Sequence, residues 1–411
     1  MSQSTKMIAI SEVARIVTGK TPSTKESLLW NGDTPFVTPG DLQFLKNIIN
    51  TGRTVSDTAC VKMAKQLLPA RTICVSCIGN LGYVGMTTKR SLSNQQINSL
   101  IPNNEKDAEY LYYAMKNLWQ FFKKLEGQST TLSILNKSQF SRICIPWPDE
   151  ITRKQIGQTL SLIDSKIELN TQLNGYLEEQ CEAVANHEKG LAVELSSLCD
   201  LVKEKADYNE ADFDTYVSTE SLLPGKKGRQ APSSLPQTGN VTVYKAGDIL
   251  VSNIRPYFKK IWYADRTGTC SGDVLVFRTK QPEQSGYLYS CMRSDAFFDY
   301  VMKGAKGTKM PRGDKKQMLT YKVASNPSGA TVDFIESALS QASSSSKENH
   351  RLAALRDNLL PKLMSGEIDV SKVDLKQLNS HLAETLRPFG CHIPAIQKTG
   401  RPALLRTAPH P

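Results

Sequence analysis

The chain has 411 residues, a formal net charge of +11 and a hydrophobic content of 39%, which indicates a globular protein with room for two or three domains. No apolar run approaches the roughly 20 residues of a membrane-spanning helix, and the start of the chain lacks the basic and apolar regions of a signal peptide. Nine scattered cysteines suit a reducing compartment better than a disulfide scaffold, so we expect a cytoplasmic protein without a membrane partner.

Residues 1–149 predict a first domain of mixed α and β structure. The segments TPFVTPGDL, TICVSCIG, SLIP and RICIPWP are short and bounded by glycine or proline, which is typical of strands. The segment AEYLYYAMKNLWQFFKKL carries apolar residues at helical spacing. A stretch of this length is long enough to bury a core of its own.

Residues 150–190 predict one long helix. Its apolar residues recur in alternating steps of four and three, which is the seam of a coiled coil. These residues are Ile156, Leu160, Ile163, Ile167, Leu177, Cys181 and Val184. Asn170 and Asn174 fall on the same seam, where polar residues can fix the register between two helices. The alternative is that both asparagines face solvent and that Leu169 and Leu173 occupy the seam. A single helix of this kind requires a partner.

Residues 191–329 repeat the pattern of the first domain. ARTICVS matches AGDILVS, EYLYYAM matches GYLYSCM, and ISEVARIV matches LSSLCDLV, all in the same order along the chain. The segments DILVSN, KIWYA and DVLVFR predict strands, and GYLYSCMRSDAFFDYVM predicts a helix. The sequence therefore predicts a second copy of the same domain.

A second long helix is predicted over residues 330–367. Its seam residues are Ile335, Ala338, Ala342, Leu352, Leu359 and Leu363. Because each long helix begins at the end of its own domain, the two should pack antiparallel. The predicted fold class is α/β (α+β), with two repeated mixed α/β domains, two long antiparallel coiled-coil helices and a pseudo-two-fold axis. Residues 368–411 contain proline and arginine without periodicity and are predicted to be a disordered tail.

Three short patterns resemble catalytic or metal sites, and each has a simpler interpretation. VTGKTP resembles the end of a phosphate-binding loop, but Ala14 stands where such a loop needs glycine. A Pro-Asp pair followed by Asp164 and Lys166 resembles a nuclease site, although both would lie on exposed faces of the first long helix. Cys74 and Cys77 lack two further zinc ligands at suitable spacing, and buried cysteines are the simpler interpretation. We therefore predict no catalytic and no metal site.

Polar and basic loops recur at equivalent places in the two domains. EGQSTTLSILNKSQF stands in the first domain and MKGAKGTKMPRGDKKQM in the second, while SCIGNLGYVG corresponds to SNIRPYFKK. Cations with glycine suit a phosphate backbone, and polar side chains can read base edges; the alternative is a solvated loop without a ligand. The predicted DNA-binding residues are Gln128, Ser129, Thr130, Lys137, Asn80, Tyr83, Arg255, Tyr257, Lys259, Lys306, Lys309, Arg312 and Lys315.

Together these blocks resemble the specificity subunit of type I restriction–modification systems. ISEVARIVTGKTPST and WNGDTPFVTPGDL resemble the opening of a target-recognition domain, and SNQQINSLIP and STTLSILNKSQFSRICIPWP its later blocks. IGQTLSLIDSKIELNTQLN and LAALRDNLLPKLMSGEI resemble the central and distal spacer helices. The second domain lacks an equivalent of SNQQINSLIP, and QASSSSKENH places four serines, which are poor helix formers, in the second helix.

The resemblance implies a subunit that performs no chemistry itself. In the family, each target-recognition domain reads one half of a split site in double-stranded DNA, and the paired helices dock two methyltransferase subunits. Restriction subunits join that core, so S-adenosylmethionine, ATP and Mg²⁺ are expected on the partners and no cofactor in this chain. The residues expected to pair the helices and dock subunits are Leu160, Ile163, Ile167, Asn170, Asn174, Leu352, Leu359 and Leu363.

Two other functions fit parts of the sequence. The chain could be a coiled-coil adaptor that binds no DNA, and salt-dependent binding to duplex DNA would count against that function. It could also be a stand-alone DNA nuclease or methyltransferase, which a catalytic assay on the purified chain would decide.

Overall fold

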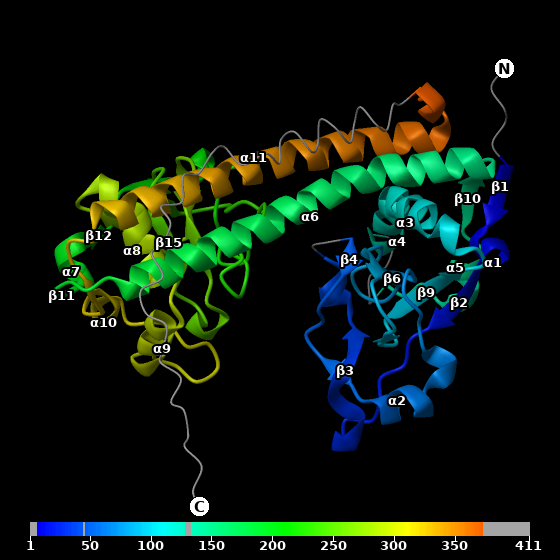
Figure 1. The fold of residues 1–411 in the computed structure, drawn as a ribbon, viewed down its shortest axis with the longest axis horizontal. Helices are drawn as coiled ribbons and strands as arrows, with labels where there is room; N and C mark the ends of the chain where they lie inside the picture. Colours follow the sequence, from blue (N-terminus) through cyan, green and yellow to red (C-terminus); the bar gives the residue numbers. More distant parts are fainter. Residues whose placement is uncertain (1–5, 44–45, 128–132, 373–411) are drawn as a thin grey trace, which may run out of the picture.

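The computed structural model describes residues 6–43, 46–127 and 133–372. Two long helices lie side by side as a rod, and one mixed α/β domain hangs beneath each end of it (Figure 1). The predicted fold class is confirmed. The tail predicted over residues 368–411 lies outside the described residues from residue 373 onward.

The first domain is built around an antiparallel sheet with a parallel edge strand. Its strand order is β2-β9-β6-β7-β4, with β1 pairing β10 and β3 pairing both β5 and β8. The strands are β1 (Lys6–Ala9), β2 (Ala14–Thr18), β3 (Trp30–Val37), β4 (Asn47–Ile48), β5 (Thr54–Val55), β6 (Ile73–Ser76), β7 (Val84–Thr87), β8 (Leu92–Ser93), β9 (Ile97–Pro102) and β10 (Cys144–Trp147). The helices are α1 (Ile10–Val13), α2 (Asp57–Lys62), α3 (Ala108–Asn117), α4 (Trp119–Gly127) and α5 (Lys137–Ser141).

The second domain repeats this arrangement. Its sheet has the order β12-β18-β15-β16, β13-β14-β17 form a second sheet, and β11 pairs β19. The strands are β11 (Ala192–Glu194), β12 (Cys199–Leu201), β13 (Lys205–Asp207), β14 (Asn240–Tyr244), β15 (Ile249–Ser252), β16 (Ile261–Tyr263), β17 (Gly268–Cys270), β18 (Val274–Thr279) and β19 (Lys322–Ala324). The helices are α7 (Leu195–Leu198), α8 (Ser285–Met292), α9 (Asp295–Lys303) and α10 (Lys315–Leu319).

Two predicted elements differ from the structure. The segment TPFVTPGDL was expected to be a strand throughout, but β3 ends at Val37 and Pro39–Leu42 form a 3₁₀ turn, because proline favours the start of a helical turn. Each predicted single helix in the domains is a pair, α3 with α4 and α8 with α9. In the second pair, α8 ends at Met292, and Ser294 caps α9 by accepting from the backbone of Phe297 (3.2 Å).

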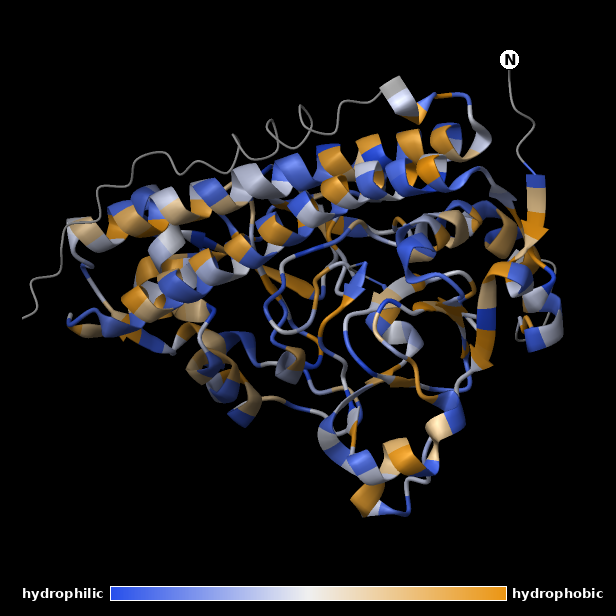
Figure 2. Ribbon diagram, turned by 45° about the vertical axis from the view of Figure 1, so that its right-hand side comes forward, coloured by the Kyte–Doolittle hydropathy of each residue, from blue (hydrophilic) through white to orange (hydrophobic). Residues whose placement is uncertain are grey.

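The rod consists of α6 (Glu150–His187) and α11 (Gly329–Ser365). Both begin with a side-chain cap, from Asp149 and Ser328 respectively. The helices run antiparallel, because Asp164 near the start of α6 pairs with Arg356 near the end of α11. At 1.5 Å per residue, the 38 residues of α6 span about 57 Å. Both helices carry mixed stripes of apolar and polar residues (Figure 2), as expected for helices buried on one side.

The ends of the rod are apolar and belong to the domain cores. Ile156, Leu160 and the distal Leu363 join the core of the first domain, whereas Cys181 and Ile335 join that of the second. The remaining predicted pairing residues, Ile163, Ile167, Leu352 and Leu359, range from buried to half-buried. Each domain is therefore packed onto both helices, which makes the rod a shared structural element.

The centre of the rod is polar. Asn170 is 2% exposed and its Nδ2 donates to Glu348 Oε2 of α11 (2.7 Å). Asn174 donates to a serine hydroxyl of α11 (3.0 Å). Leu169 and Leu173, the alternative seam residues, are exposed. The asparagines therefore lie between the helices, where their hydrogen bonds select one register.

Asp164 and Lys166 were expected on exposed faces of α6, and this expectation is wrong. Asp164 is 4% exposed and accepts from Arg356 Nη1 (2.6 Å) and from the hydroxyl of Tyr113 (2.6 Å). Lys166 is 3% exposed and lies 3.5 Å from Glu348. Because α6 packs against both α3 and α11, little of its surface is exposed. Each of the two buried charges is therefore paired with an opposite charge on α11.

Candidate nucleic-acid interface

The two basic segments predicted in the second domain lie against each other. The backbone N–H of Arg255 donates to Pro311 O (2.8 Å), and that of Gly313 donates to Asn253 O (3.2 Å). These bonds join the loop after β15, residues 253–260, to the loop before α10, residues 304–314. We call them the arginine loop and the basic loop. Side chains separated by about fifty residues in the sequence thus form one surface.

The basic loop is a small hairpin. The backbones of Lys306 and Arg312 exchange two hydrogen bonds of 2.9 Å each. Gly307 has φ +97°, a conformation that glycine adopts without the strain of a side chain. Lys309 therefore lies at the exposed tip of a defined turn.

Carboxylates accompany part of this positive charge. Lys306 pairs with Asp314 (3.2 Å) and Arg312 with Asp273 (3.3 Å), and both cations are more than half exposed. Among the residues that the structure describes, no carboxylate pairs with Lys309. Exposed ion pairs contribute little stability, so Lys306 and Arg312 can exchange their carboxylates for phosphate oxygens at small cost.

The arginine loop is held in an unusual conformation. Arg255 and Lys259 both have φ +51°, in the left-handed region, which non-glycine residues rarely adopt. The Nε of Arg255 is buried without a hydrogen-bond partner within the described ranges. Tyr257 is exposed and packs on Phe258, with ring centroids 4.6 Å apart. Strained residues gather at functional sites, and this loop offers a cation beside an exposed aromatic ring.

Lys259 is engaged inside the protein. Its Nζ lies 3.0 Å from Asp295 Oδ1 at the start of α9. Its side chain is mostly covered, unlike that of Lys315, which is exposed at the first position of α10. Lys259 therefore differs from Lys306, Lys309, Arg312 and Lys315, whose side chains are exposed.

The first domain contains the same pair of loops. Ile78 and Ile134 form an isolated β-bridge, as Ile254 and Arg312 do in the second domain. Asn136 caps α5 by accepting from the backbone of Gln139 (2.9 Å), just as Asp314 caps α10. The predicted residues Lys137 and Lys315 both follow these caps directly and are exposed. The repeat therefore extends to the position of individual candidate residues.

The other candidates of the first domain lie near these loops. Asn80 is exposed, whereas Tyr83 is half-buried and stacks on Trp119, with ring centroids 5.8 Å apart. Lys123 lies over the Trp119 ring at 4.4 Å. Sequence reasoning missed this stack. The predicted residues Gln128, Ser129 and Thr130 lie outside the described residues.

The patterns that resembled catalytic sites have structural roles. A Cβ on Gly19 would come within 2.1 Å of Asn94 O, so this glycine permits close backbone packing rather than a phosphate cradle. Cys74 and Cys77 are buried. Within the described ranges, no group of three or more His, Cys, Asp or Glu side chains is arranged to hold a metal ion.

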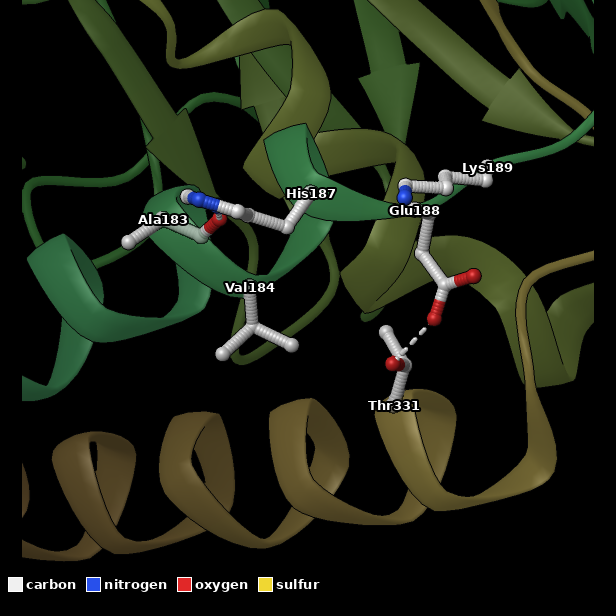
Figure 3. A pocket seen from close by; sticks show the side chains of 6 residues that line it. All are labelled: Ala183, Val184, His187, Glu188, Lys189 and Thr331. Atoms are coloured by element: carbon white, nitrogen blue, oxygen red, sulfur yellow. Dashed lines mark hydrogen bonds between the residues drawn. The ribbon is translucent and has the colours of Figure 1, made fainter. Parts of the chain in front are cut away.

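A shallow pocket lies where the end of α6 meets the start of α11 (Figure 3). Its lining residues are Ala183, Val184, His187, Glu188, Lys189 and Thr331. Glu188 accepts hydrogen bonds from the hydroxyls of Thr331 and Ser328, which ties the two helix ends together. None of the predicted DNA-binding residues lines this pocket. We interpret it as a surface depression where the ends of the two helices pack, and not as a binding site.

We expect Cys74 and Cys77 to resist alkylation in the folded protein while Cys144 reacts. Burial raises the pKa of both thiols to about 12, although hydrogen bonds with Ser99 and Asn98 lower it in part; the reactive species is the thiolate. Cys144 is exposed. Brief iodoacetamide treatment followed by peptide mass spectrometry checks this, with urea-unfolded protein as the control. Equal rates for Cys74 and Cys144 in the folded protein would contradict it.

The fold consists of two repeated mixed α/β domains, each with a pair of exposed loops, joined by a helical rod. Residues 3–179 match the family described as "Type I restriction modification DNA specificity domain". The first domain and most of α6 therefore belong to this family, and the resemblance noted in the sequence is confirmed. Among the described residues, no helix is both long and apolar enough to cross a membrane.

Two curated relatives are type I restriction enzyme specificity subunits. The HindI subunit of Haemophilus influenzae is 37% identical over 147 residues, which cover 35% of this chain and 32% of the relative. The MjaIX subunit of Methanocaldococcus jannaschii is 31% identical over 174 residues, which cover 41% of this chain and 40% of the relative. The chain thus spans about a third to two fifths of the length of the curated relatives it matches.

Solved structures of the same kind of subunit also align with this chain. The S subunit from M. genitalium covers 89% of this chain and 97% of its own length, with 16% identity and a TM-score of 0.48. The HsdS subunit from Thermoanaerobacter tengcongensis covers 90% and 98%, with 12% identity and a TM-score of 0.35.

Proposed function

We propose that this chain is the DNA-recognition subunit of a type I restriction–modification complex, in which each domain reads one half of a bipartite site in double-stranded DNA. The observation that carries the proposal is the repeat of the loop pair. The first domain belongs to a DNA specificity family, and the second places its own two loops at equivalent positions. A fold that presents the same reading surface twice suits a target with two halves.

The rod supports this proposal through its length. A helix of about 57 Å corresponds to roughly 17 base pairs at 3.4 Å each. Half-sites about one helical turn apart, which face the same side of the duplex, would therefore fit between the domains. The buried polar centre at Asn170 would fix the register of the helices and hence the separation of the two reading surfaces.

We further propose that the rod docks the catalytic partners. On α6, Leu169, Leu173 and Tyr176 are exposed at steps of four and three, so they form one uncovered apolar stripe. Two methyltransferase subunits and, beyond them, restriction subunits would supply the chemistry. S-adenosylmethionine, ATP and Mg²⁺ would then act on those partners, and this chain would contribute recognition without catalysis in the cytoplasm.

The test is a genome-wide map of methylated adenines in a strain with this gene and in its deletion mutant. We expect deletion to remove methylation at one bipartite motif, and reintroduction of the gene to restore it. The control is expression of the partner methyltransferase, which must be equal in all strains. An unchanged methylation pattern in strains that express the methyltransferase would refute the proposed function.

A further inference from the structure

The arginine loop is fixed from a second side by a segment that the sequence analysis did not single out. The backbone N–H groups of Gly225 and Lys226 donate to Phe258 O (2.8 Å) and Lys259 O (2.9 Å). Lys226 has φ +62°, so it shares the left-handed conformation of Arg255 and Lys259. Three such residues meet at this joint, and a strained conformation persists only where the surroundings hold it.

One carboxylate joins the two strained lysines. Asp295 Oδ1 lies 3.0 Å from the Nζ of Lys226 and 3.0 Å from the Nζ of Lys259. Lys226 also pairs with Glu182 of α6 (3.1 Å), which in turn accepts from Arg293 (2.9 Å). The arginine loop is thereby connected through charged groups to the rod.

The first domain makes the same connection with different chemistry. The shift along the sequence that aligns Ala70 with Ala246 also aligns Tyr83 with Lys259 and Trp119 with Asp295. In the first domain these positions form an aromatic stack with an angle of 29° between the rings. In both domains, then, the end of one loop contacts the first residue of a helix. The loop after β6 contacts the start of α4, and the arginine loop after β15 contacts the start of the equivalent helix, α9. This recurrence indicates that the attachment serves the geometry of the loop.

We propose that Asp295 is a positioning residue for DNA recognition by the second domain: with Lys226 and Lys259, it holds the arginine loop so that Arg255 and Tyr257 face the DNA. This inference rests on the proposed function and assigns a residue to it. Asp295 touches no DNA in this scheme. Its effect on recognition passes through the conformation of the loop.

Electrostatics and positioning predict opposite effects of removing this carboxylate. Asp295 is 63% exposed, so its loss adds positive charge to a surface that binds a polyanion. Charge alone would therefore strengthen binding to every duplex. Positioning predicts weaker discrimination between target and non-target DNA, because base readout depends on accurately placed side chains.

The experiment measures duplex binding by the complex of this chain with its methyltransferase subunit. The duplexes carry the bipartite target obtained from the methylation map, the same target with either half scrambled, or the target with both halves scrambled. Discrimination is the ratio of the affinity for the target to the affinity for a scrambled duplex. We expect Asp295→Asn to reduce it at least about tenfold for one scrambled half, the half that the second domain reads, which is the scale of one lost base contact. Discrimination against the other scrambled half, and affinity for fully scrambled DNA, should not fall.

The matched control is Asp299→Asn, which removes the same charge from an exposed position of α9. Among the described residues, Asp299 has no ion-pair partner, so discrimination should stay at the wild-type value. Lys226→Gln breaks the same joint from the other side, should reproduce the loss, and serves if Asp295→Asn does not fold. Wild-type discrimination in the folded Asp295→Asn or Lys226→Gln complex, or an equal loss with Asp299→Asn, would overturn the inference. A wild-type complex that does not discriminate at all would instead refute the proposed function.

Discussion

Replacing Arg356 by methionine should lower the free energy of unfolding by about 3–5 kcal/mol, the range for breaking a buried ion pair. Among the described residues, Arg356 and the hydroxyl of Tyr113 both donate to the carboxylate of Asp164, each at 2.6 Å. Methionine keeps much of the side-chain volume but leaves the buried Asp164 without its ion-pair partner between α6, α11 and the first domain. The large effect therefore comes mainly from burying the Asp164 carboxylate without its ion-pair partner, and less from the loss of the Arg356–Asp164 hydrogen bond itself.

Urea unfolding followed by far-UV circular dichroism measures this change. Arg351→Met is the matched control, because Arg351 is exposed on the same helix and has no ion pair among the described residues. Adding Asp164→Leu and Tyr113→Phe to Arg356→Met should recover part of the stability, since the buried ion pair and the hydroxyl that hydrogen-bonds to it are then removed together. A loss no larger for Arg356→Met than for Arg351→Met would mean that the ion pair does not hold the rod to the first domain.

The rod is the element that the sequence predicted best. Alternating apolar steps over residues 150–190 and 330–367 correspond to Glu150–His187 and Gly329–Ser365. A seam of this length repeats its signal many times, so single exceptions do not hide it. The four serines are such an exception: α11 continues through Ser343–Ser346, because packing against α6 outweighs their low helix propensity.

The burial of Asp164 could not be predicted from the pattern of one helix. Sequence spacing shows which residues share a face, but not that α3 covers a second face of α6. The same limit applies to Lys259, which looked like a free cation because its partner Asp295 lies on another element. A comparison of the two repeats offered the missing signal. Tyr83 and Trp119 of the first domain align with Lys259 and Asp295 of the second domain. An aromatic pair in one copy and an oppositely charged pair in the other indicate that these two positions are in contact.

The candidate interface was predictable in its location and less so in its charges. The repeat predicted a pair of loops at equivalent positions in each domain. In the second domain, backbone hydrogen bonds from Arg255 and Gly313 join the arginine loop to the basic loop. Which cations are free depends on carboxylates from elsewhere in the chain. Asp273 reaches Arg312 from the segment before β18, a contact that spacing alone does not reveal.

Replacing Lys306, Lys309 and Arg312 together by glutamine should weaken DNA binding and make it less sensitive to salt. Each phosphate contact contributes about 0.9 to the slope of log affinity against log salt concentration, because bound counterions are released. The loss of three contacts would therefore lower the slope by up to about 2.7. Titrations of a labelled duplex at several salt concentrations measure this slope.

The single change Lys309→Gln separates the contributions of the three cations. Lys309 lacks a carboxylate partner among the described residues, so it should account for about 0.9 of the slope. Lys306 and Arg312 must first release Asp314 and Asp273, and their share of the affinity should be smaller. The control replaces Lys189, Lys322 and Lys347, three exposed lysines outside both loops, and removes the same net charge. If this control lowered the slope as much as the loop variant does, the DNA would respond to the overall charge of the protein, and the basic loop would not be its binding surface.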